Sequence, residues 1–115
     1  MMIKVNELKE FLGCDDEFLA HLMEIFIKES GEGIARLKTA ADGKNWQMVR
    51  ATAHKMLSST RIFNIGELSN VLEEIEKMAE KGTDVETIPA KVSAVEQSWK
   101  IVIEEIKVLL PTLKK

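Results

Sequence analysis

The sequence predicts an all-α protein, an antiparallel up-and-down four-helix bundle with a short N-terminal helix that covers one end. Apolar residues recur every three or four positions, which is the periodicity of amphipathic helices, and no alternating strand pattern occurs. Glycines, prolines and capping residues divide the chain into one short and four long segments of about 17 to 27 residues. Short connections make sequential helices pack as antiparallel neighbours, so these segments favour a bundle.

The first two helices begin and end at recognisable signals. A short helix is expected over residues 5–12. Asp15 is a good N-cap for a second helix, which should reach about Ala41. Gly31 and Gly33 lie inside this helix, and each costs about 1 kcal/mol relative to alanine. We therefore expect a bend or a local break there.

The remaining three helices follow from the same kinds of signal. The third should begin after Asn45, another capping residue. The fourth is expected from near Leu68 and is closed by Gly82. The last should begin near Pro89, which a first turn tolerates, and Pro111 should end it.

Composition limits the classes of function. At 115 residues, with 45% apolar and 30% charged residues, the chain fits a single globular domain over residues 1–115. A net charge of −3 with interspersed signs argues against a nucleic-acid partner. Cys14 is the only cysteine, so neither an internal disulfide nor a thiolate metal cluster can form. No leader pattern and no run of about 18 apolar residues is present, which favours a cytoplasmic protein without direct membrane contact.

One residue is a candidate for chemistry. His54 follows Ala53 of the buried stripe, so it is rotated by about 100° onto an exposed flank. Arg50 and Arg61 bracket it there, one turn before and two turns after. A neutral imidazole offers a ring-nitrogen lone pair to an electrophilic phosphorus, and the arginines would screen the charge of the resulting phosphoryl group.

Small neighbours support the same hypothesis. Ala51 and Ser58 would let another protein approach His54 closely, and the Ser58 hydroxyl could reach a phosphoryl oxygen. Periodicity alone, however, favours an ordinary surface histidine. The surrounding sequence decides between the two interpretations.

The segment around His54 resembles the motif of the HPt domain family of multistep two-component phosphorelays. The resemblance rests on residues 53–66, AHKMLSSTRIFNIG, followed by Glu67-Leu68 and by LEEIE at residues 72–76. Residues 18–37 and the entry at residues 43–46 also fit, so most of the chain takes part. The resemblance implies that His54 is the phosphoacceptor of a histidine phosphotransfer module.

The motif departs from the family pattern at two positions. The family histidine is usually followed by lysine three positions on and by glycine four positions on, where this chain has Leu57 and Ser58. Lys55, Arg50 and Arg61 are candidates for the charge-screening role of that lysine, and Arg61 fits the helical face best. We interpret the chain as a lysine-shifted variant of the motif.

The resemblance also implies partners. A response-regulator receiver domain would carry the aspartyl phosphate beside a bound Mg²⁺, and a hybrid sensor histidine kinase would supply the relay. The chain itself would need no cofactor or metal and would be a monomeric phosphocarrier without ATP-dependent kinase activity. For the docking surface we expect Ala51, Leu57 and Ile62, surrounded by cations.

Two other classes of function remain open. The chain could be an inactive helical adaptor or dimerisation bundle, or, as the weakest alternative, an independent enzyme, although no nucleophile, base and orienting group occur together. His21 is expected on a solvated helix face and not in a metal site. The acidic residues of the fourth helix are interpreted as a solvated face; they are Glu73, Glu74, Glu76 and Glu80.

Overall fold

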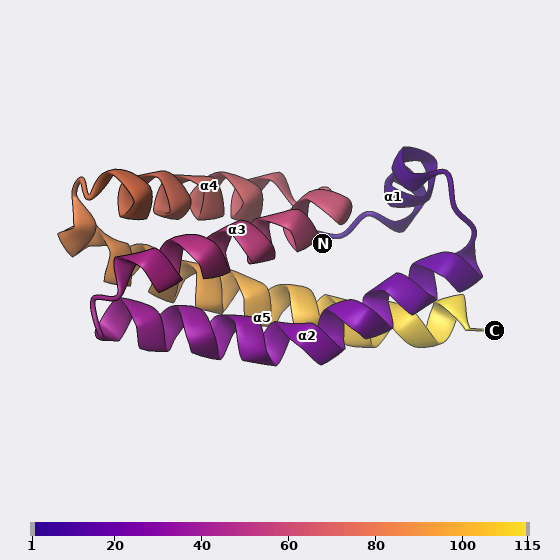
Figure 1. Ribbon diagram of the computed structural model, residues 1–115. Coiled ribbons are helices and arrows are strands. Elements are labelled where there is room, and N and C mark those ends of the chain that lie inside the picture. Colours follow the sequence, from indigo (N-terminus) through magenta and orange to yellow (C-terminus); the bar gives the residue numbers. More distant parts are fainter. Residues whose placement is uncertain (1, 115) are drawn as a thin grey trace.

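The computed structural model describes residues 2–114, which form helices without any strand in that range. The elements are α1 (Val5–Leu12), α2 (Asp16–Asp42), α3 (Trp46–Ile62), α4 (Gly66–Lys81), the 3₁₀ turn η1 (Val85–Thr87) and α5 (Ile88–Leu113). Each of the four long helices packs against the next one along the chain, and α5 closes the bundle against α2 (Figure 1). The predicted fold class is confirmed.

Local capping interactions fix where the helices begin and end. The side chains of Asp15 and Asn45 each accept a hydrogen bond from the backbone N–H three residues on, at 2.9 and 3.2 Å. Gly13 and Gly82 follow α1 and α4 in the left-handed region, with φ of 63° and 68°. Glycine adopts this conformation without a Cβ clash, so both helices end where the sequence indicates.

The structure corrects two expectations about helix interruptions. The helix α2 runs unbroken through Gly31 and Gly33, so the local break is absent, although the axis of α2 changes direction along its length (Figure 1). A Cβ on Gly33 would lie 3.4 Å from Cγ of Met56, so α3 packs closely against this turn and supports it. Pro111 lies inside α5 instead of ending it. It removes one hydrogen bond in the last turn, where the burial of Leu113 keeps the helix packed on the core.

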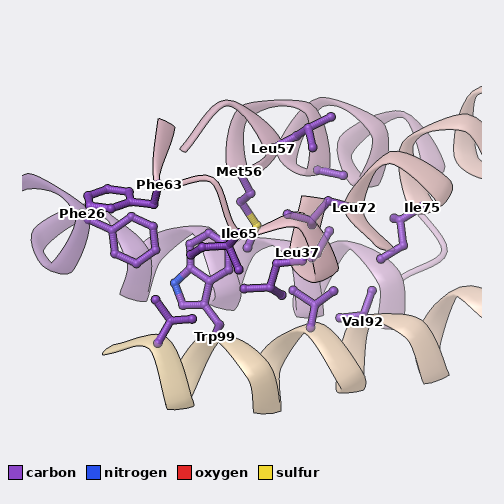
Figure 2. Close-up of a cluster of buried hydrophobic side chains, with 14 of the residues drawn as sticks. Phe26, Leu37, Met56, Leu57, Phe63, Ile65, Leu72, Ile75, Val92 and Trp99 are labelled. Carbon is purple, nitrogen blue, oxygen red and sulfur yellow. The ribbon is translucent and has the colours of Figure 1, made fainter. Parts of the chain in front are cut away.

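Aromatic rings anchor one part of the core. Phe26 of α2 stacks on Trp99 of α5 with ring centroids 5.0 Å apart, and it meets Phe63 edge-on at 4.9 Å. Figure 2 shows these rings beside aliphatic side chains from the other helices. Trp99 is only 4% exposed, so it packs in the core.

The N-terminal segment covers the end of the bundle where α2 and α5 extend past α3 and α4 (Figure 1). Ile3 and Leu8 are buried there. The buried carboxylate of Glu105 accepts hydrogen bonds from the backbone N–H groups of Met2 and Ile3, at 3.0 and 2.9 Å. This pairing fixes the segment to α5 and satisfies a carboxylate that would otherwise be costly to bury.

A tight connection turns α3 back along α4. Asn64 adopts a positive φ of 54°, and the N–H of Ile65 donates to the carbonyl oxygen of Thr60 at 2.9 Å. The hydroxyls of Thr60 and Ser69 then join the two helices at 2.9 Å. Residues at equal distances from the turn therefore face one another across the α3–α4 pair.

The core analysis predicts the effect of truncating Trp99. Trp99→Ala should lower the free energy of unfolding by about 3–5 kcal/mol, because it removes a buried ring and leaves a cavity. Ile101→Ala in the same helix should change it by less than about 0.5 kcal/mol, since Ile101 is 54% exposed. Urea denaturation followed by circular dichroism measures both, and similar midpoints for the two variants would contradict the assignment of the core.

Candidate functional site

His54 lies at the centre of α3, with its side chain 68% exposed. Its neighbour Ala53 is fully buried. Successive residues of a helix are rotated by about 100°, so Ala53 faces the core and His54 faces the surface. The expected exposure of His54 is confirmed, and a partner protein can reach its ring.

A carboxylate from α4 holds one nitrogen of that ring. Nδ1 of His54 lies 2.7 Å from Oε1 and 3.2 Å from Oε2 of Glu76. Because carboxylate oxygens accept hydrogen bonds, Nδ1 must be the donor. The neutral ring then carries its hydrogen on Nδ1, and the lone pair is on Nε2. The arrangement therefore leaves one defined nucleophilic nitrogen.

The sequence interpretation of Glu76 was wrong. It was placed on a solvated face, but its side chain is only 18% exposed because it is turned toward α3. His54 and Glu76 are 22 residues apart, with Ile65 midway between them. An antiparallel pair of helices that reverses near Ile65 brings these two positions together, so the position of the turn was the signal that could have identified Glu76.

A second carboxylate of α4 binds two cations. Oε1 of Glu73 lies 2.9 Å from Nζ of Lys77, and Oε2 lies 3.7 Å from Nη2 of Arg61. The hydrogen bond to Lys77, followed by the charges of Lys77 and Arg61, lowers the pKa of Glu73. The same hydrogen bond raises the pKa of Lys77. Arg61 therefore lies on the α4 side of α3, as the helical face predicted, but it is paired with a carboxylate.

The other polar candidates lie elsewhere on the exposed surface of α3. Arg50 and Lys55 are exposed. Lys55 lines a cavity of about 110 Å³ between α2, α3 and α5, and so lies toward α2 and away from Glu76. The Ser58 hydroxyl is exposed and donates to the backbone carbonyl oxygen of His54 at 3.4 Å, a long hydrogen bond that leaves it available to another acceptor.

The apolar candidates divide into two groups. Ala51 and Ile62 are exposed, and Ile62 retains 43% of its surface. Leu57 is only 2% exposed, so its assignment to the docking surface was wrong. It lies three residues after His54 on the side that packs against α4, where it belongs to the core.

Two structural findings bear on other classes of site. Among residues 2–114, no group of three histidine, cysteine, aspartate or glutamate side chains is close enough to hold a metal ion. Over the same range, no helix is long and apolar enough to cross a membrane. His21 is exposed on α2.

Sequence comparison defines the class of protein. Residues 21–108 match the Hpt domain, and this range contains α3, α4 and most of α2 and α5. The chain therefore belongs to the Hpt domain family, whose members are phosphotransfer modules of phosphorelays and work with receiver domains and kinases. No curated protein sequence matches the chain.

A solved structure has the same fold. The chain is similar to histidine-containing phosphotransfer protein B (HptB) from Pseudomonas aeruginosa PAO1, with a TM-score of 0.85. The two chains are 21% identical, and the match covers 96% of this chain and 95% of the other. At this identity the likeness establishes the fold, and the roles of individual residues depend on the geometry described above.

The His54–Glu76 contact predicts a defined tautomer. In the wild-type protein at a pH where the ring is neutral, most His54 rings should carry the hydrogen on Nδ1, because Glu76 accepts it. Glu76→Ala should shift the population toward the Nε2–H form. The ¹⁵N chemical shifts of the two ring nitrogens report the ratio, with His21 as an internal control. An unchanged ratio in the variant would show that Glu76 does not orient the ring.

Proposed function

We propose that His54 accepts a phosphoryl group on Nε2 from the aspartyl phosphate of a response-regulator receiver domain and passes it on. The observation that supports this role is the ring itself, which is 68% exposed while Nδ1 is bound by Glu76. An accessible imidazole with one free lone pair in a fixed orientation suits in-line attack on phosphorus.

The proposed transfer is a single displacement. The Nε2 lone pair forms an N–P bond as the P–O bond to the receiver aspartate breaks, and the carboxylate leaves with the electron pair. The ring then carries a positive charge that extends to Nδ1–H. The carboxylate of Glu76, already hydrogen-bonded to Nδ1, compensates this charge during the reaction. Reversal of the same steps returns the phosphoryl group to a receiver.

Most of the transfer chemistry would come from the partner. A receiver domain would hold Mg²⁺ beside its aspartate, and the metal would stabilise the charge on the equatorial oxygens. This chain would need no cofactor and no ATP site. It would contribute a nucleophile and a docking surface on α3, in which Ala51 and Ile62 are exposed apolar positions and Arg50 and Lys55 are exposed cations.

The place in the relay follows from the same chemistry. As a monomeric phosphocarrier without kinase activity of its own, the protein would exchange phosphoryl groups with a hybrid sensor histidine kinase, through the receiver domain of that kinase, and with a separate response regulator. Such an exchange would take place in the cytoplasm. An inactive helical adaptor is the second candidate, and the buried Leu57 at the usual lysine position is the observation that favours it.

A histidine exchange tests the assignment. His54→Gln should remain folded, because the side chain is exposed, and should no longer be labelled by a ³²P-phosphorylated receiver. His21→Gln is the matched control and should be labelled like the wild type. The label should be labile in acid and stable in base, as expected for an N–P bond. Persistent labelling of His54→Gln would refute the assignment, and an unlabelled wild type would favour the adaptor.

Two cation variants test which side of α3 supports the phosphoryl group. Arg61→Ala should slow transfer to His54 by roughly threefold, whereas Lys55→Ala should have a smaller effect, because exposed charges contribute modestly and Lys55 lies toward α2. Rapid-quench measurements with one phosphorylated receiver give both rates. If the two variants are slowed equally, the face assignment of Arg61 is wrong.

A further inference from the structure

We propose that Lys77 of α4 supplies the positive charge that the position three residues after His54 lacks, and that Glu73 holds this charge beside the phosphoacceptor until a phosphoryl group arrives. The inference rests on the proposed function of His54. Lys77 belongs to α4, whereas His54 and the position three residues after it belong to α3.

The helix α3 has no lysine three residues after His54. Leu57 occupies that position and is 2% exposed, packed in the core between α3 and α4. A leucine side chain carries no charge, so Leu57 cannot supply a cation near His54. A cation that supports a phosphoryl group on this side of the ring must therefore come from α4 or from farther along α3.

Lys77 lies in the second half of α4. Its neighbour in the sequence, Glu76, makes direct contact with the His54 ring, so α4 passes close to the phosphoacceptor at this point. Nζ of Lys77 lies 2.9 Å from Oε1 of Glu73. The pKa of Lys77 is raised first by this hydrogen bond and also by the negative charge of Glu76. Lys77 is therefore already attracted by both carboxylates on this side of His54.

Phosphorylation of His54 would add negative charge near Lys77. A phosphoryl group brings a charge of about −1.5 to −2 and three acceptor oxygens, more than a carboxylate offers. The Lys77 side chain is 62% exposed and has a flexible four-carbon stem, so a change of rotamer is enough for it to turn toward the new charge.

Glu73 is the carboxylate that Lys77 would leave. Glu73 retains Arg61, 3.7 Å away, as a partner. Because the carboxylate keeps a cation, releasing Lys77 leaves no isolated charge on α4. Because both Arg61 and Lys77 pair with Glu73, Lys77 can move away while Arg61 remains.

A lysine pair provides the test. Lys77→Ala should slow phosphoryl transfer from a phosphorylated receiver by about two- to fivefold, the range expected when one exposed charge is lost. It should also raise the pH at which the phosphoryl group on His54 changes from dianion to monoanion, followed by ³¹P NMR, because the cation favours the dianion. Lys77→Arg should restore both readouts.

Lys91→Ala is the matched control. Lys91 is also paired with an α4 carboxylate, Glu74, at 3.0 Å, but it belongs to α5, whereas Lys77 belongs to the helix that holds the His54 ring. It should leave both readouts at wild-type values. If Lys77→Ala and Lys91→Ala behave alike while the wild type is labelled on His54, the role of Lys77 is overturned and the phosphotransfer function stands. If the wild type is not labelled, both proposals are overturned.

Discussion

The antiparallel packing of α3 against α4 is the constraint on which the site depends. The buried side chains of Leu57, Leu72 and Ile75 join the two helices along their length, and the Thr60–Ser69 hydrogen bond fixes their register near the turn. The proposed nucleophile, His54, comes from α3, and its hydrogen-bond partner, Glu76, comes from α4. A shift by one residue would carry Glu76 away from Nδ1 of His54.

Placing His54 on α3 and Glu76 on α4 meets two requirements that would otherwise conflict. A phosphoacceptor must be exposed so that a partner can reach it, yet exposed side chains sample several rotamers and both histidine tautomers. The half-buried Glu76 of α4 holds Nδ1 of the His54 ring and leaves Nε2 free. The charges are also distributed over two helices, since α3 carries Arg61 and α4 carries the carboxylates and Lys77.

Features that depend on local sequence were predictable, and features that depend on a neighbouring helix were not. The caps Asp15 and Asn45 act within one turn, and the exposure of His54 follows from its position next to Ala53. Periodicity could not tell which flank of the stripe α4 would cover, so Leu57 was placed at the surface and Glu76 in solvent. The choice of phosphoryl chemistry for His54 came from the family motif, because helical spacing alone does not distinguish a nucleophile from a surface histidine.

The end of the molecule that α1 covers is attached differently from the rest. Residues 2–12 contribute only Ile3 and Leu8 to the buried core and are also held by the two amide hydrogen bonds to Glu105, whereas the four long helices supply most of that core. Proteins open in cooperative units, and a segment with few buried contacts opens at a lower cost than the core. Local opening of residues 2–12 would leave the middle of α3 in place. The amino end can therefore loosen, or accept substitutions, while His54, the proposed phosphoacceptor, keeps its contact with Glu76.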